Sequence, residues 1–275
     1  MILNPYRFSA GVTGYLLDDY AGASAGYSLR ELTTTSWNVG DVVIQARNSL
    51  STRDTFTSAE VFDGTLVTFA DLGDGSASVE RWYDQSGNAN NIFQSTPSLQ
   101  PLIVSGGVLL ADGLKFDGTN DFFDCEFSHG TTSAQSIFTV AQTSDLTGNR
   151  MLIDGRDAND DGIGMFYLTS SDFIRFHVDA TDVFSNTSLS ANTEYLFSGI
   201  YGSTTSTFYE DGTQTDTDTG APASSSSTTN YHIGRVAYTS SAFWQGSIQE
   251  VIIYPDDQSA NQAGIDGNIT THYGI

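Results

Sequence analysis

Residues 154–162 have the spacing of the front half of a calcium-binding loop. From Asp157 onward they match Asp-x-Asn-x-Asp-Gly, in which alternate oxygens face the ion and the glycine permits a sharp turn. Position twelve of that pattern is Leu168 instead of a bidentate glutamate. A polar turn between two strands is therefore the favoured interpretation, with a Ca²⁺ site as the alternative. The candidate Ca²⁺ ligands are Asp154, Asp157, Asn159 and Asp161.

A second segment, residues 79–91, combines aromatic rings with amides and a carboxylate. Its sequence, Val-Glu-Arg-Trp-Tyr-Asp-Gln-Ser-Gly-Asn-Ala-Asn-Asn, offers groups that stack on a sugar ring and hydrogen-bond its hydroxyls. A structural role suits the same residues and is favoured: an indole in the core, side chains bonding their own backbone, and Gly87 at positive φ. Tyr238 and Trp244, near the late strands, have the same two interpretations, a sugar contact or a structural role. The candidate glycan-binding residues are Trp82, Tyr83, Asp84, Gln85, Asn88, Tyr238 and Trp244.

Other site chemistry is excluded by residue type and spacing. The four histidines are far apart without metal-ligand spacing, so a histidine zinc site is not expected. Cys125 is the single cysteine, and its strand-like neighbours predict a buried small hydrophobe and not a nucleophile. The sequence contains no Gly-x-Ser-x-Gly elbow, P-loop or dinucleotide fingerprint. No cofactor other than the Ca²⁺ just considered is expected.

Charge and composition narrow the classes of partner. The chain has 275 residues, with 10 Lys+Arg against 33 Asp+Glu and a formal net charge of −23. The electrostatic field of so negative a chain repels phosphate backbones and anionic bilayers, and the basic residues form no cluster. Neither nucleic acid nor a membrane is therefore an expected partner. No stretch approaches the roughly eighteen apolar residues of a membrane helix. The first residues lack the features of a secretory signal.

The elements that must position these residues are mostly strands. Short β-rich runs separated by Gly, Asn, Asp and Ser recur along the chain, and Asp211-Gly212 is a strong hairpin signal. In one run, Phe173, Arg175 and His177 are expected to point away from the face that carries the intervening residues. The expected runs are 41–47, 64–70, 136–142, 164–168, 173–178 and 194–201.

Helical periodicity is confined to the C-terminus, where Ile265, Ile269 and Tyr273 fall four apart ahead of Gly274. The predicted fold class is all-β, an antiparallel two-sheet jelly-roll sandwich with one C-terminal helix. Residues 21–275 are expected to form a single domain, and residues 1–20 an arm that docks onto a neighbour. The Ser/Thr/Asp/Gly-rich segment 213–229 is expected to be a long surface loop.

Three segments, 26–32, 79–91 and 243–255, together resemble the catalytic-domain frame of the fungal α-L-arabinofuranosidase B family. They also resemble the concanavalin A-like or laminin G-like jelly-roll modules of bacterial and phage surface proteins. The opening residues 3–8, Leu-Asn-Pro-Tyr-Arg-Phe, resemble virion proteins of marine phages. The resemblance implies two curved antiparallel sheets with the ligand on the concave face.

The resemblance also implies which carboxylates an enzyme would need. Retaining glycosidases require a nucleophile and an acid about 5–5.5 Å apart. In the family these are a Glu in a mid-chain Asp-x-Glu-Asn segment and an Asp after Gly-Gly before the last strands. Here residues 164–176 contain no Glu, residues 234–246 contain no acid, and the family's adjacent cysteine pair is absent. Glu210 and Glu250 fall in strand or turn contexts where solvation is expected, so no catalytic residue is assigned.

The sequence therefore predicts a non-enzymatic virion surface protein, a capsid decoration or a fibre component, with a lectin-like fold that binds host glycans. Its expected partners are other virion proteins, host-surface carbohydrate and further copies of itself. A phage protein reaches the outside by lysis, which fits the missing signal. The alternative is an arabinofuranosidase-type glycoside hydrolase with relocated carboxylates. A lectin or adhesion domain cut from a larger protein is less favoured, given Met1 and the complete C-terminal helix.

Overall fold

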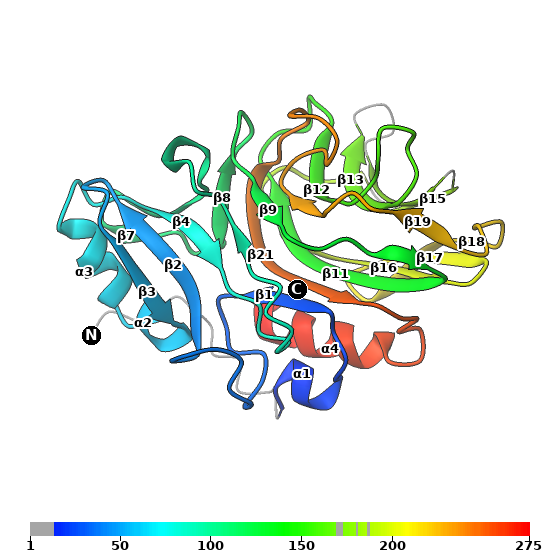
Figure 1. The fold of residues 1–275 in the computed structure, drawn as a ribbon, viewed down its shortest axis with the longest axis horizontal. Helices are drawn as coiled ribbons and strands as arrows, with labels where there is room; N and C mark the ends of the chain where they lie inside the picture. Colours follow the sequence, from blue (N-terminus) through cyan, green and yellow to red (C-terminus); the bar gives the residue numbers. More distant parts are fainter. Residues whose placement is uncertain (1–13, 169–172, 180, 186–187) are drawn as a thin grey trace.

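Antiparallel strands form two layers that pack face to face as a sandwich (Figure 1). The computed structural model describes residues 14–168, 173–179, 181–185 and 188–275. The predicted all-β sandwich with a C-terminal helix is confirmed. Among the described residues, no helix is long and apolar enough to cross a membrane.

The first layer follows a continuous series of pairings from β3 to β15. In spatial order it contains β3 (Arg53–Thr57), β2 (Val42–Asn48), β4 (Ala77–Trp82), β5 (Ile92–Phe93), β9 (Phe123–Cys125), β20 (His232–Ile233), β12 (Arg150–Asp154), β13 (Ile163–Leu168), β14 (Phe173–Val178) and β15 (Thr181–Phe184).

The second layer is centred on β21 and β11. Both β1 and β8 pair with β21, while β16, β17 and β18 extend the layer from β11. At one end β6 pairs with both β4 and β8, which joins the layers. The bounds are β1 (Ala25–Ser28), β6 (Leu102–Ser105), β7 (Val108–Leu109), β8 (Leu114–Asp117), β11 (Ala134–Thr143), β16 (Tyr195–Gly202), β17 (Thr205–Glu210), β18 (Thr213–Asp218) and β21 (Gln245–Tyr254), with β10 (Gly130–Thr132) and β19 (Ser225–Ser227) forming a separate pair.

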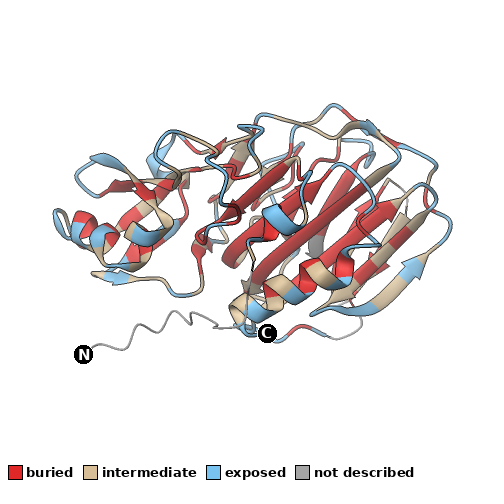
Figure 2. Ribbon diagram, turned by 90° about the horizontal axis from the view of Figure 1, so that it is seen from below, coloured by how far each residue is buried: buried red, intermediate tan, exposed pale blue. Residues whose placement is uncertain are grey.

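Two hydrophobic clusters stabilise this arrangement. The larger fills the space between the layers. The smaller lies on the outer face of the second layer, where α1 (Leu16–Asp19) and α4 (Gln262–Tyr273) cover β11 and β21 (Figures 1 and 2). Ile265 and Ile269 are buried there, which explains the spacing of four. Cys125 is buried as predicted.

Residues 64–70 are not the expected strand. They begin α3 (Thr65–Asp71), which follows α2 (Ser58–Phe62). A capping box starts α2, because the Thr57 hydroxyl accepts from the Glu60 amide and the Glu60 carboxylate accepts from the Thr57 amide. In α3, burial of Leu66, Phe69 and Ala70 follows the three-and-four spacing of one helix face. Tertiary burial therefore overrides the β-propensity of this run.

Two other expectations need qualification. Segment 213–229 is not a continuous loop, because it contains β18 and β19. Of the predicted arm 1–20, residues 1–13 lie outside the described residues, while Leu16 and Leu17 of α1 are buried against the chain's own second layer. Docking of the arm onto a neighbour stays a prediction.

The expectation that Glu250 is solvated is wrong, because its side chain is fully buried beneath α4. Its carboxylate pairs with Arg30 at 2.7 Å and accepts hydrogen bonds from Ser28 and Tyr273. Burial alone would raise the pKa of Glu250, but the Arg30 guanidinium outweighs it and the pKa lies below its ordinary value. The pair fastens β21 to the segment after β1 and to the end of α4.

Stability is expected to fall as the pH rises through about 6, because burial raises the pKa of Asp266 on α4 to about 6. A folded-state pKa above the unfolded value of about 3.9 means that the folded protein binds this proton more tightly, so stability is highest below the unfolded pKa and declines above it. At pH 8, Asp266→Asn is expected to be about 1–3 kcal/mol more stable than wild type. Urea unfolding at pH 5 and pH 8 measures the difference.

The matched control for this pH dependence is Asp54→Asn, since Asp54 is exposed. It should unfold with the wild-type pH dependence. An Asp266→Asn protein that loses as much stability as wild type between pH 5 and pH 8 would show that another group is responsible.

Candidate functional site

One row of side chains crosses the outer face of the first layer. Directly opposed residues on antiparallel strands point to the same face. The register pairs each member of the row with the next across eight strands, from β4 to β15. We call this set the polar row: Arg81, Phe93, Asp124, His232, Asp154, Gly164, His177 and Asp182.

The neighbours of the polar row along each strand show which way it faces. They belong to the core between the layers, so the row points away from it. The predicted alternation in β14 is confirmed, because Phe176 and Val178 lie in the core while Arg175 and His177 join ion pairs on the other face. The core neighbours are Trp82, Ile92, Phe123, Cys125, Ile153, Ile233, Ile163, Met165, Phe176, Val178 and Val183.

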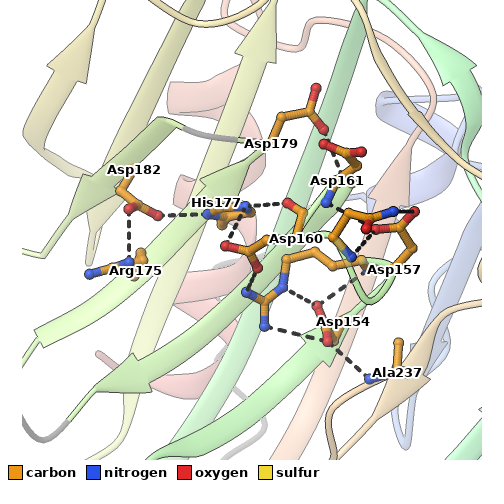
Figure 3. A network of polar contacts seen from close by, with 12 residues as sticks. Asp154, Asp157, Asp160, Asp161, Arg175, His177, Asp179, Asp182 and Ala237 are labelled. Atoms are coloured by element: carbon orange, nitrogen blue, oxygen red, sulfur yellow. Dashed lines mark hydrogen bonds and ion pairs between the residues drawn. The ribbon is translucent and has the colours of Figure 1, made fainter. Parts of the chain in front are cut away.

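The centre of the polar row is a closed network of charges (Figure 3). The Arg156 guanidinium lies 2.6 Å from Asp154 and 2.6 Å from Asp160. Gly164 makes room for it, since a Cβ there would lie 2.7 Å from the Asp154 carboxylate and 3.3 Å from Arg156 Nε. Asp154 also accepts a hydrogen bond from the Ala237 amide at 2.9 Å.

His177 continues this network toward the edge of the layer. Its Nδ1 lies 2.8 Å from the Asp182 carboxylate, and its Nε2 lies 3.0 Å from the backbone oxygen of Asp160. Asp182 also pairs with Arg175 at 2.8 Å. Because His177 is buried under the 155–162 turn, its ring is held in place and is not accessible to a ligand.

The other end of the polar row is more open. The Asp124 carboxylate, 39% exposed, lies 2.8 Å from His232 Nδ1 and 3.3 Å from Arg235. Burial opposes ionisation of Asp124, but His232 and Arg235 outweigh it and hold its pKa below the ordinary value. Arg235 stacks on Phe122 with 4.3 Å to the ring centroid. Tyr238, 43% exposed, lies three residues further along.

This arrangement leaves no carboxylate of the polar row without a cationic partner. The three carboxylates of the row, Asp124, Asp154 and Asp182, each lie within 2.8 Å of an arginine or histidine nitrogen. A retaining glycosidase needs one carboxyl group that gives up a proton and one that attacks the sugar. Carboxylates held by cationic partners are weak proton donors and weak nucleophiles, whereas they accept hydrogen bonds well.

Four of the predicted glycan-binding residues are buried. Trp82 and Trp244 are both 0% exposed in the core, so the structural role that the sequence favoured for them is confirmed and the stacking alternative is wrong. Asp84 and Gln85 are each 1% exposed. Asp84 accepts from the amides of Gly26, Ser86 and Asn90, and Gln85 bonds the backbone at residues 28, 30 and 32.

The remaining predicted residues keep an accessible position. Tyr83 is half-buried and follows Arg81 on the outer side of β4, with 5.9 Å between the guanidinium and the ring centroid. Asn88 is exposed and donates to the Ala23 carbonyl. Tyr238 is 43% exposed and follows Arg235 by three residues in the chain. These three residues stay predictions as sugar contacts.

The structure does not gather the predicted Ca²⁺ ligands. Asp154 is held by Arg156, while the Asp157 carboxylate accepts from the amides of Asn159 and Asp161. Among the described residues, no group of three or more Asp, Glu, His or Cys side chains is placed to hold a metal. The segment forms the polar turn that the sequence favoured. Calcium binding would require Arg156 to move and stays a prediction.

Sequence reasoning missed most of the polar row. Arg81, Asp124 and His232 lie far apart in the chain, and only the strand register brings them together. The one available signal was alternation: Asp124 lies between the apolar Phe123 and Cys125, as Arg175 and His177 lie between apolar neighbours.

Comparison with solved structures shows a shared fold. A GH54 α-L-arabinofuranosidase superposes with a TM-score of 0.65 at 12% identity, covering 94% of this chain and 64% of that chain. A sialidase from Trypanosoma rangeli superposes with a TM-score of 0.50 at 12% identity, covering 70% of this chain and 31% of that chain. This chain therefore spans less than two thirds of either protein.

The predicted resemblance to the arabinofuranosidase frame is confirmed at the level of the fold. No curated protein matches the sequence. A family model, however, matches residues 117–263, which include the open end and the centre of the polar row. By that match the chain belongs to the concanavalin A-like lectin/glucanases superfamily.

Proposed function

We propose that this chain is a non-enzymatic carbohydrate-binding protein that holds a saccharide at the open end of the polar row. The observation that carries the proposal is the pairing of all three row carboxylates with basic nitrogens at 2.8 Å or less. Such pairing favours recognition over hydrolysis. It fixes charged hydrogen-bonding groups in position, and rigid polar groups of this kind bind sugar hydroxyls at a low entropic cost.

The open end supplies both components of sugar recognition. Phe122 and Phe243 are half-buried aromatic residues with 6.3 Å between their ring centroids, and Tyr238 is exposed nearby in the chain. Arg235 donates hydrogen bonds and Asp124 accepts them, which suits adjacent hydroxyls of one sugar. The likeness to a GH54 α-L-arabinofuranosidase makes arabinofuranosides the first saccharides to try.

Replacing Arg235 by Met is expected to weaken saccharide binding about tenfold to a hundredfold, because it removes the donors and keeps the stem on Phe122. Tyr238→Ala should weaken binding as well. A glycan array followed by calorimetry measures both. The control is Arg53→Met, since the Arg53 side chain is 50% exposed on β3, outside the polar row.

Two outcomes would count against this proposal. If Arg235→Met and Tyr238→Ala bind as tightly as wild type, the saccharide does not occupy the open end. If wild type releases nitrophenol from 4-nitrophenyl α-L-arabinofuranoside, the chain is a hydrolase with relocated carboxylates.

We also propose that the protein acts on the surface of a virus particle, as an oligomer in contact with other virion proteins. Its support is the resemblance of residues 3–8 to virion proteins and the net charge of −23, which keeps a crowded surface protein soluble. Antibody labelling of source particles tests this location.

A further inference from the structure

A hollow that shares no residue with the polar row lies beside α1. Its volume is about 410 Å³, within the usual range for small-ligand sites. Four segments form its walls: α1, the link after α1, the loop 33–37 and the turn 85–87. The lining residues are Leu17, Asp18, Ala21, Gly22, Ala23, Thr33, Thr34, Thr35, Ser36, Trp37, Gln85, Ser86 and Gly87.

We propose that this hollow is a second ligand site, which takes one ring of a neutral sugar against Trp37. The site is independent of the polar row. It is built from hydroxyl-bearing residues beside one indole, which is the combination that holds a sugar ring by stacking and by hydrogen bonds to its hydroxyls.

Trp37 differs from the other two tryptophans of the chain. Trp82 and Trp244 are 0% exposed, whereas Trp37 is half-buried. The core packs against Trp37, its amide donates to Asp41 at 3.3 Å, and its indole nitrogen donates to the Val42 carbonyl at 3.4 Å. The indole is therefore held in place while part of it stays accessible, as a stacking platform requires.

The polar wall is fixed before any ligand arrives. The Asp18 carboxylate accepts from the hydroxyls of Thr33 and Thr34 and from the Thr34 amide at 3.1 Å. The Thr33 hydroxyl in turn accepts from the Thr35 amide at 3.0 Å. These bonds tie the loop to α1, so little conformational entropy remains to be lost on binding.

The opposite wall is made of small residues. A Cβ added at Gly22 or at Gly87 would meet nothing within 4 Å, and Ala21 is exposed. Backbone and methyl groups therefore leave room for a ring at this wall.

The charge of the lining selects a neutral ligand. Asp18 is its one acidic residue, and hydrogen bonds from Thr33 and Thr34 lower the pKa of Asp18, so it stays ionised at neutral pH. None of the described lining residues is basic. A sugar bearing a carboxylate or a sulfate would meet one negative charge without a compensating cation, in a protein of net charge −23.

Tryptophan fluorescence tests the proposal, because iodide quenches accessible indoles and the other two are fully buried. Wild type is titrated with L-arabinose, D-galactose, D-glucose and their disaccharides. We expect a saturable change in emission and protection from iodide, and no effect from glucuronic or sialic acid. Trp37→Phe should abolish the fluorescence change yet keep binding by calorimetry, since the ring remains.

Two further variants separate binding from folding. Trp37→Ala should weaken binding about tenfold or more. Ala21→Gln adds a side chain at the exposed rim and should have the same effect without disturbing the core, while Val39→Gln, at a residue 98% exposed, is its control. Arg235→Met should leave the Trp37 signal unchanged, so failure at the polar row and failure at this hollow are distinguishable.

The proposal is overturned if no neutral saccharide protects Trp37 from iodide, or if Ala21→Gln binds as wild type does. Equal binding of acidic sugars would overturn the assignment to neutral ligands.

Discussion

Replacing Glu250 by Gln is expected to lower the free energy of unfolding by about 3–5 kcal/mol. Arg30 contacts both oxygens of this carboxylate, at 2.7 Å and 2.8 Å, and Glu250 is 0% exposed. Without Glu250 the guanidinium would remain as an uncompensated charge beneath α4. The hydroxyls of Ser28 and Tyr273 would also lose a charged acceptor. Urea unfolding followed by circular dichroism measures the change.

The control for Glu250→Gln is Glu31→Gln, because Glu31 is exposed and the hydrogen bond that it accepts from Tyr15 is 3.4 Å long. That variant should differ from wild type by less than about 0.5 kcal/mol. A loss below about 1 kcal/mol in Glu250→Gln would mean that solvent reaches Arg30.

A double replacement separates the effect of losing the ion pair from the effect of leaving Arg30 buried without its partner. In Arg30→Met/Glu250→Leu both charges are gone, so the desolvation cost of ionic groups disappears with them. We expect the double variant to be more stable than Glu250→Gln. If it is less stable, the pair itself, and not the stranded charge, supplies the stability.

The fold class was predictable from the sequence because its signals are local. Alternating runs and Asp-Gly turns mark strands, and the spacing of Ile265 and Ile269 marks α4. The error at residues 64–70 has the same origin. Thr, Val and Phe favour strands, but the helix is decided by the burial of Leu66, Phe69 and Ala70 on one face, which depends on tertiary packing and not on the run itself.

The candidate site could not be predicted in the same way, because it depends on register. His232 opposes both Asp124 and Asp154, from strands remote in sequence, and a bulge in β12 between Met151 and Ile153 decides which face Asp154 occupies. A search for metal-like histidine spacing along the chain cannot find such a row. A sequence motif also does not show which of its residues are buried, since Trp82 and Tyr83 are neighbours that point to opposite faces.

Asp84→Ala is expected to destabilise the protein by about 3 kcal/mol or more and so to decide what the 79–91 segment does. The carboxylate accepts from the amides of Gly26 at 2.9 Å, Ser86 at 2.8 Å and Asn90 at 3.0 Å. All three amides would lose their acceptor, and each unpaired buried amide costs about 1–3 kcal/mol. The bond to Gly26 also joins this turn to β1.

Asp84→Asn and Asn88→Ala complete the comparison. The Asn side chain keeps one oxygen but turns an NH₂ group toward the Asn90 amide, so we expect a smaller loss of about 1–2 kcal/mol. Asn88 is exposed, and its truncation should cost about 1 kcal/mol or less. If Asp84 bound a saccharide directly, Asp84→Ala would abolish binding at unchanged stability. A large fall in unfolding free energy instead identifies the carboxylate as the centre of a turn that holds β1 against β4.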